Sequence, residues 1–120
     1  MIPHLVPPLL EAPVTDWIRH HIDRTLGLLH ATYDELETAA QMKRSDTFEA
    51  LRMARLRMGT LRYGVTGWTP EYDLVLRMQR CIDAYLKTGN REMLIDLANF
   101  AELEWVHPSR EGTYYEAVDR

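Results

Sequence analysis

Apolar residues recur every three or four positions through most of the chain, which is the spacing of one face of an α-helix. The first such run begins after Thr15 or Asp16, either of which can cap a helix. Its apolar positions are Ile18, Ile22, Leu26, Leu29, Tyr33, Leu36 and Ala40. The pattern predicts one long amphipathic helix here.

A second helix is predicted from the capping residues Ser45 and Asp46 to about Tyr63. Its predicted buried stripe consists of Phe48, Leu51, Ala54, Met58 and Leu61. The segment GVTGW, residues 64–68, then reads as a turn.

A third helix is predicted after Thr69-Pro70-Glu71, which supplies a cap, a first-turn proline and an acid in the order that a helix start favours. Its predicted apolar face consists of Val75, Met78, Ile82 and Tyr85, and Lys87-Thr88-Gly89-Asn90 ends it. A fourth helix runs from about Asn90 or Arg91 to Val106, because Pro108 prevents extension beyond it.

Four helices with short connections predict an all-α, four-helix bundle-like single domain over residues 15–107. An extended N-terminal arm, residues 1–14, precedes it, because four prolines in MIPHLVPPLLEAP prevent a regular helix. An irregular C-terminal tail, residues 108–120, follows it, and its adjacent Tyr114 and Tyr115 either dock on a partner or fold back on the domain.

The arm is apolar, with Ile2, Leu5, Val6, Leu9 and Leu10, so it is expected to pack along the domain or against a second subunit. A two-fold dimer offers a seam that can receive both arms. We therefore predict a homodimer with the arm and the fourth helix near the seam.

Composition narrows the class of protein. A chain of 120 residues with 46% hydrophobic content suits one domain with its own core. The net charge of -4 argues against a nucleic-acid partner, and no apolar run approaches the roughly 20 residues of a membrane span. Cys81 is the single cysteine, and a cytoplasmic location is predicted.

The fourth helix carries polar residues in an apolar setting. Around a helix of about 100° per residue, its apolar positions gather on one side at Leu94, Leu97, Ala98, Ala101 and Trp105. Asp96 points away from that stripe, and Glu92 and Asn99 lie near Asp96's polar face. Either these residues contact a neighbouring helix or an arginine, or they bind a metal or ligand in a cleft.

The second helix carries Arg52, Arg55 and Arg62 within about a quarter-turn of one another. Guanidinium groups can donate paired hydrogen bonds to phosphate oxygens, which makes this face a candidate phosphate site. The alternative is a solvated face whose arginines pair with acids of the first helix, namely Asp34, Glu35 and Glu37.

The run LRMQRCIDAYLKTGNREMLIDLANFAELE resembles the helix pair, ending in a "liDlaNya" pattern, of small phage and actinobacterial helical proteins. These are in turn similar to the MazG-like all-α nucleotide pyrophosphohydrolases, in which two acidic pairs hold magnesium against a nucleotide triphosphate. With the following HPS the resemblance spans about 35 residues, and it places Asp96 at the acid of the second pair. The spacing departs from the family's pattern by one, because Glu92 lies four residues before Asp96, and Asp34-x-x-Glu37 is the nearest candidate for the first pair.

Two functions are carried forward. The resemblance implies a nucleotide-phosphate binding or pyrophosphohydrolase-like protein, with Mg²⁺ on Glu92 and Asp96 and ligand contacts from Arg52, Arg55, Arg62 and Asn99. The alternative is a non-enzymatic interaction protein, encoded by a phage or mobile element, that binds a host protein. The resemblance favours the first, and the poor first acidic pair favours the second.

Overall fold

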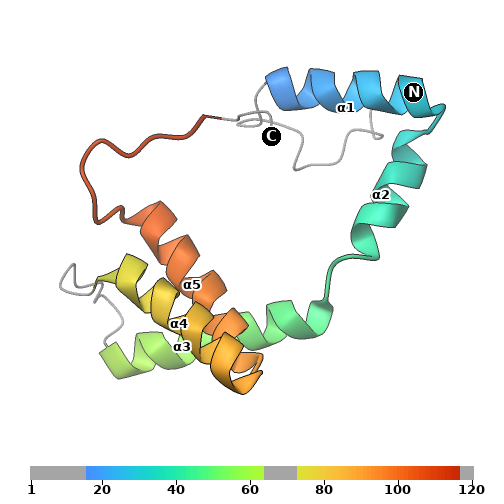
Figure 1. Cartoon of the computed structure of the whole chain (residues 1–120). Coiled ribbons are helices and arrows are strands. Elements are labelled where there is room, and N and C mark those ends of the chain that lie inside the picture. Colours follow the sequence, from blue (N-terminus) through green and yellow to red (C-terminus); the bar gives the residue numbers. More distant parts are fainter. Residues whose placement is uncertain (1–15, 64–72, 117–120) are drawn as a thin grey trace. The chain divides into compact units, whose positions relative to one another are not determined.

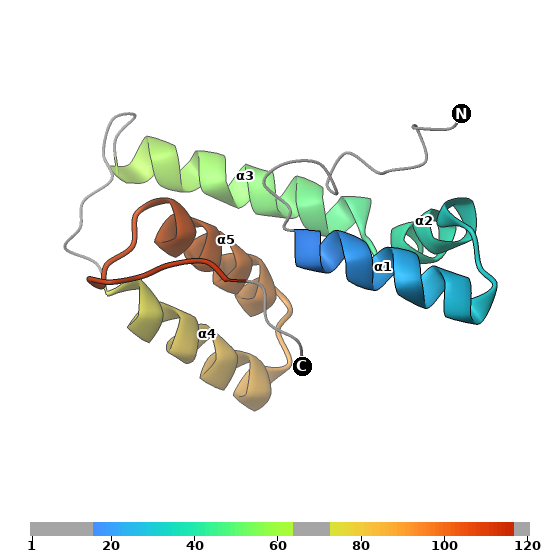
Figure 2. The same cartoon turned by 90° about the horizontal axis from the view of Figure 1, so that it is seen from above.

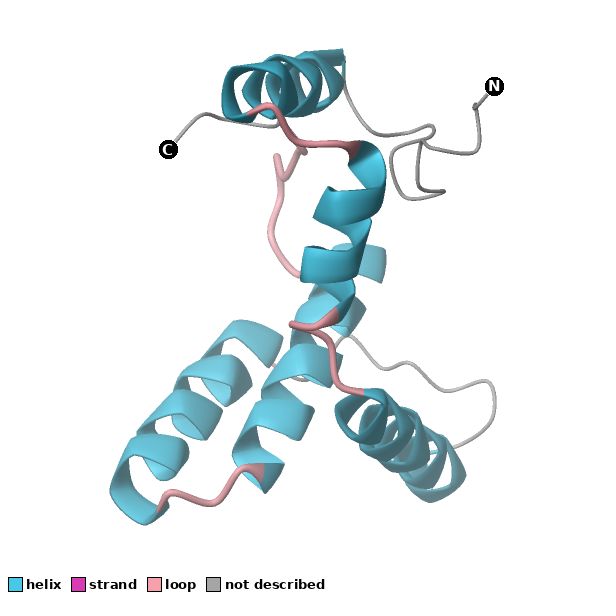
Figure 3. Cartoon of the chain, turned by 90° about the vertical axis from the view of Figure 1, so that its right-hand side faces the viewer, coloured by secondary structure: helices cyan, strands magenta, loops and turns pink. Residues whose placement is uncertain are grey.

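The computed structural model describes residues 16–63 and 73–116, and the fold is given for these ranges. All their regular structure is helical, which confirms the predicted all-α class (Figure 3). The helices are α1 (Asp16–Leu29), α2 (Tyr33–Gln41), α3 (Asp46–Tyr63), α4 (Leu74–Thr88) and α5 (Glu92–Val106) (Figure 1).

The helices belong to two compact units, each described by itself. α1 and α2 belong to one unit, and α3, α4 and α5 belong to the other, Ser45–Thr113. The predicted arm, residues 1–14, and the predicted turn, residues 64–68, lie outside the described residues. The domain boundaries at residues 14 and 107 therefore stay predictions.

The prediction of a single long helix in the first part of the chain is wrong, because two helices, α1 and α2, form there. His30 has a left-handed backbone with φ 53°, and the Ala31 N–H returns to the Leu26 carbonyl at 2.9 Å. Thr32 then starts α2 with a capping box: its hydroxyl accepts from the Glu35 N–H, and the Glu35 carboxylate accepts from the Thr32 N–H. A left-handed residue ends a helix and a capping box begins another, so the apolar period continues across a real break.

Side chains also connect α1 with α2. The Tyr33 hydroxyl donates a hydrogen bond to the Asp23 carboxylate, which raises the pKa of the phenol. Within α1, the rings of Trp17 and His21 stack with centroids 5.5 Å apart. The Tyr33–Asp23 hydrogen bond thus joins α2 to α1 without an apolar core between them, because neither helix contains a buried residue.

The ends of α3, α4 and α5 follow local capping chemistry. The Ser45 hydroxyl accepts from the Phe48 N–H at 3.0 Å, so α3 begins and ends as predicted. α4 begins at Leu74, capped by Asp73, rather than after Thr69-Pro70-Glu71, which lies outside the described residues. It ends before Gly89, whose φ of 70° is a conformation that glycine adopts without strain. The bounds of α5 match the prediction.

The core of the second unit forms where α5 lies against both α4 and α3 (Figures 1 and 2). Its buried residues in the described ranges are Leu74, Cys81, Ile95 and Asn99. The predicted apolar faces are therefore wrong in part: Ile82 of α4 is 45% exposed and Trp105 of α5 is 67% exposed. α4 and α5 pack through the turns that carry Leu74, Cys81 and Ile95 instead.

Candidate functional site

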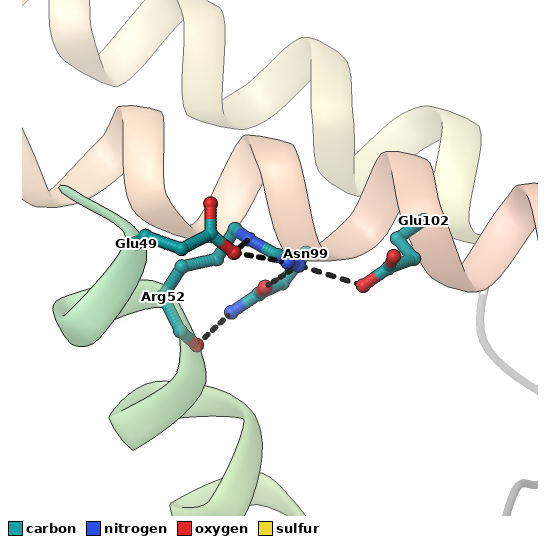
Figure 4. Close-up of polar contacts among 4 residues, drawn as sticks. All are labelled: Glu49, Arg52, Asn99 and Glu102. Atoms are coloured by element: carbon teal, nitrogen blue, oxygen red, sulfur yellow. Dashed lines mark hydrogen bonds and ion pairs between the residues drawn. The ribbon is translucent and has the colours of Figure 1, made fainter. Parts of the chain in front are cut away.

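Arg52 of α3 is the centre of a polar contact with α5, and its side chain is only 15% exposed. Its Nη1 donates to Glu102 at 2.6 Å and to the Asn99 side-chain oxygen at 3.2 Å. Its Nε and Nη2 both donate to Glu49, one turn earlier on α3 (Figure 4). The guanidinium therefore has carboxylate or amide partners on both helices.

Asn99 is buried and uses both ends of its amide on Arg52. Its Nδ2 donates to the Arg52 backbone carbonyl at 2.9 Å, while its oxygen accepts from the Arg52 guanidinium (Figure 4). A buried amide is stable only where its donor and acceptor are satisfied, and this reciprocal contact satisfies both. The polar residue in the apolar part of α5 is thus a connection to α3.

Arg55 lies one turn further along α3 and contacts two acids of α5. Its Nε is 2.8 Å from a Glu92 oxygen and 3.3 Å from Asp96, and its Nη2 is 3.4 Å from the second Asp96 oxygen. Together with the Asn99–Arg52 contact, these distances show the first of the two sequence interpretations, in which polar residues of α5 contact arginines of a neighbouring helix. The acids that pair with Arg52 and Arg55 are Glu49, Glu92, Asp96 and Glu102, rather than the predicted Asp34, Glu35 and Glu37.

Both arginines are held in the charged form. Hydrogen bonds to Glu49 and then Glu102 raise the pKa of Arg52, and the hydrogen bond to Asp96 raises that of Arg55. A guanidinium is already charged at any ordinary pH, so Arg52 and Arg55 keep their charge in these contacts.

The predicted metal ligands fit Mg²⁺ poorly. Glu92 and Asp96 share one cation, Arg55, so a metal ion on both carboxylates would lie beside a guanidinium or displace it. Mg²⁺ also needs near-octahedral oxygen ligands. No group of three or more His, Cys, Asp or Glu side chains in the described ranges is arranged to hold a metal ion.

The structure brings together five of the six predicted site residues at the α3–α5 contact and leaves out Arg62, which is exposed in the last turn of α3. A phosphate at Arg52 would compete with two carboxylates already bonded to it. Sequence reasoning missed Glu49 and Glu102. Glu49 lies three residues before Arg52 on one helix, and this spacing predicts an ion pair between them.

A second feature of α3 is apolar. Leu51, Met58 and Leu61 are 48%, 47% and 80% exposed, and Ala54 is exposed as well, so the stripe predicted as buried is wrong for these residues. α3 docks on α5 through the face that holds Arg52 and Arg55, which leaves the more apolar face outward. We call Leu51, Ala54, Met58 and Leu61 the α3 seam.

No family model, curated protein or solved structure matches the chain. In the described ranges, each helix is too short or too polar to cross a membrane. The candidate sites therefore rest on the geometry of this chain.

Proposed function

We propose that this chain is a non-enzymatic protein-interaction module that acts in the cytoplasm by binding another protein through its exposed apolar helix faces. One observation carries the proposal: α3 exposes Leu51, Ala54, Met58 and Leu61 along one face, in a chain whose described residues bury few large apolar side chains. Apolar surface that is grouped on one face of a soluble protein marks a binding surface more often than scattered single residues do.

The largest exposed groups lie on several helices. They include Leu28 and Leu29 on α1, Leu61 on α3, Leu86 on α4 and Trp105 on α5, which are between 67% and 80% exposed. Burial of a Leu-sized side chain contributes roughly 1.5 to 3 kcal/mol, so covering two or three of them could drive association.

The proposal includes the predicted homodimer, with the arm, residues 1–14, and α5 near the interface between the two subunits. The observation that favours it is on α5, where Trp105 and Ala101 are exposed on the same side as Leu94 and Ala98. Light scattering on the full chain and on a chain starting at Ala12 tests it. A monomer at tens of micromolar, or equal association by both chains, would contradict this part.

The second candidate function is nucleotide-phosphate binding or pyrophosphate hydrolysis. The observation that favours it is the placement of Arg52 and Arg55 on one helix face next to the acids of α5. It requires a nucleotide to displace the carboxylates that now pair with those arginines, and such a displacement costs the existing charge-assisted hydrogen bonds.

One pair of experiments separates the two functions. The full chain is incubated with a panel of nucleoside triphosphates and Mg²⁺, and pyrophosphate is measured. In parallel, immobilised chain is used to capture proteins from an extract of the cells that produce it, with Leu28→Glu, Leu61→Glu, Leu86→Glu and Trp105→Glu as separate baits. If the proposal holds, no pyrophosphate is released. The unaltered chain captures a protein, and at least one of the four variants fails to capture it. Pyrophosphate release, or capture indifferent to every bait, would overturn it.

A further inference from the structure

We infer that the α3 seam binds an acidic amphipathic helix of a partner protein. The inference rests on the proposed function and names the surface and the chemistry of the partner. Leu51, Ala54, Met58 and Leu61 are spaced by three, four and three residues, which is the a/d spacing of a coiled-coil seam. The seam is about 15 Å long, which is about one and a half heptads, so a partner helix of two to three heptads covers it with residues to spare at its ends.

The seam faces away from the contact that holds α3 in place. α3 docks on α5 through Arg52, which is only 15% exposed and lies about 100° or more around the helix from every seam residue, while Arg55 lies between Arg52 and the Leu51 edge of the seam. On the seam side, Leu61 is 80% exposed. α3 is thus positioned by polar contacts, and its apolar stripe is presented outward.

The edges of the seam are basic. At about 100° per residue, Arg62 lies next to one edge of the stripe and Arg57 next to the other, and both are exposed. From residue 50 to residue 63 the helix has four arginines and no acid, although the whole chain carries a net charge of -4. Because Glu49, Glu102, Asp96 and Glu92 neutralise Arg52 and Arg55, the cations left to the seam are Arg57 and Arg62.

This charge pattern selects the occupant. Residues that flank a coiled-coil seam set partner choice through opposite charges, so an occupant with Glu or Asp at its flanking positions is favoured. A second copy of this seam is disfavoured: in parallel pairing Arg57 meets the second copy's Arg62, and in antiparallel pairing Arg57 meets its own equivalent.

An anionic membrane surface fits less well. Interfacial helices use a wide apolar face with aromatic residues, whereas this stripe contains four residues within about 80° of the helix, includes an alanine and has no aromatic residue.

The test uses the full chain and two designed three-heptad peptides with the same leucine seam, one flanked by glutamates and one by lysines, measured by fluorescence anisotropy. The glutamate peptide should bind at least about tenfold more tightly than the lysine peptide. Leu61→Glu, and separately Arg57→Glu with Arg62→Glu, should each weaken its binding about tenfold or more.

Matched controls come from α4. Leu86→Glu places the same charge at a side chain that is 76% exposed, and Arg80→Glu reverses an exposed arginine. Both variants should bind the glutamate peptide like the parent chain. The melting temperature should not change in Leu61→Glu, because an exposed side chain contributes little to folding.

Four results would overturn the inference. Equal binding of the two peptides would remove the charge argument. Self-association that Leu61→Glu abolishes would make a second copy the occupant, and a fall in melting temperature would place the seam under another part of the same chain. Binding to vesicles of mixed neutral and anionic lipid, lost in Leu61→Glu without peptide binding, would make the occupant a membrane. If the extract still yields a protein captured independently of Leu61, only this inference fails and the proposed function stands.

Discussion

Replacing Asn99 by alanine should destabilise the second unit by about 2.5 kcal/mol. The substitution removes two hydrogen bonds with Arg52: one to its backbone carbonyl, at 2.9 Å, and one from its guanidinium, at 3.2 Å. A neutral hydrogen bond contributes about 1 kcal/mol net, and one to a charged group about 1.5 kcal/mol at the low end of its range. The low end applies because Arg52 keeps Glu49 and Glu102 and is not left unpaired.

The measurement is urea unfolding of the full chain followed by far-ultraviolet circular dichroism. The unfolding midpoint should fall while the slope against urea stays the same, because the exposed surface hardly changes. Gln79→Ala on the exposed side of α4 is the control, and it should shift the free energy of unfolding by less than about 0.5 kcal/mol.

A double-mutant cycle separates the two bonds. Arg52→Met removes the guanidinium but keeps the backbone carbonyl, so Asn99→Ala in that background should cost only about 1 kcal/mol. The coupling between the two side chains is then about 1.5 kcal/mol. An equal cost of Asn99→Ala in both backgrounds, or a cost below about 0.5 kcal/mol, would refute the reasoning that Asn99 joins α5 to α3.

Three further predictions concern other contacts. Thr32→Ala removes the capping box of α2 and should lower the free energy of unfolding by about 1 kcal/mol in urea, while Thr38→Ala, within α2, should not. Asp96→Asn should cost under about 1 kcal/mol, because Arg55 keeps Glu92 at 2.8 Å, and the loss should shrink in high NaCl. Burial raises the pKa of the Cys81 thiol above its ordinary 9.0, so folded chain should react with iodoacetamide more slowly than urea-unfolded chain. Because the folded pKa is the higher one, stability should fall as pH rises past 9.0, and less so in Cys81→Ser.

Helix ends were predicted best, because their causes are local. Ser45 caps α3 through a hydrogen bond three residues away, and Gly89 ends α4 through its own backbone conformation. The break between α1 and α2 was also local, since Thr32 and Glu35 form the T-x-x-E spacing of a capping box. The continuous apolar period concealed it, because a period does not show whether the backbone continues.

Buried faces were predicted poorly, because they depend on contacts between segments far apart in the chain. The stripe Leu51 to Leu61 has a clear helical period and is nevertheless exposed. The contact that positions α3 joins Arg52 to Asn99, which are 47 residues apart. No property of residues near Arg52 specifies which acid or amide of α5 it meets, so that long-range pairing could be stated only as one alternative.

The two faces of α3 differ in the free energy they make available, and this difference bears on function. Its inner face is held by hydrogen bonds and ion pairs, each contributing on the order of 1 kcal/mol net. Its outer face leaves Leu61 80%, Leu51 48% and Met58 47% exposed, and burying a fully exposed side chain of that size contributes roughly 1.5 to 3 kcal/mol. A partner helix that covers the seam could therefore gain several kcal/mol without disturbing the Arg52–Asn99 contact. Since α3 is already helical and positioned, little of that gain is spent on ordering it, which favours association over rearrangement of the unit.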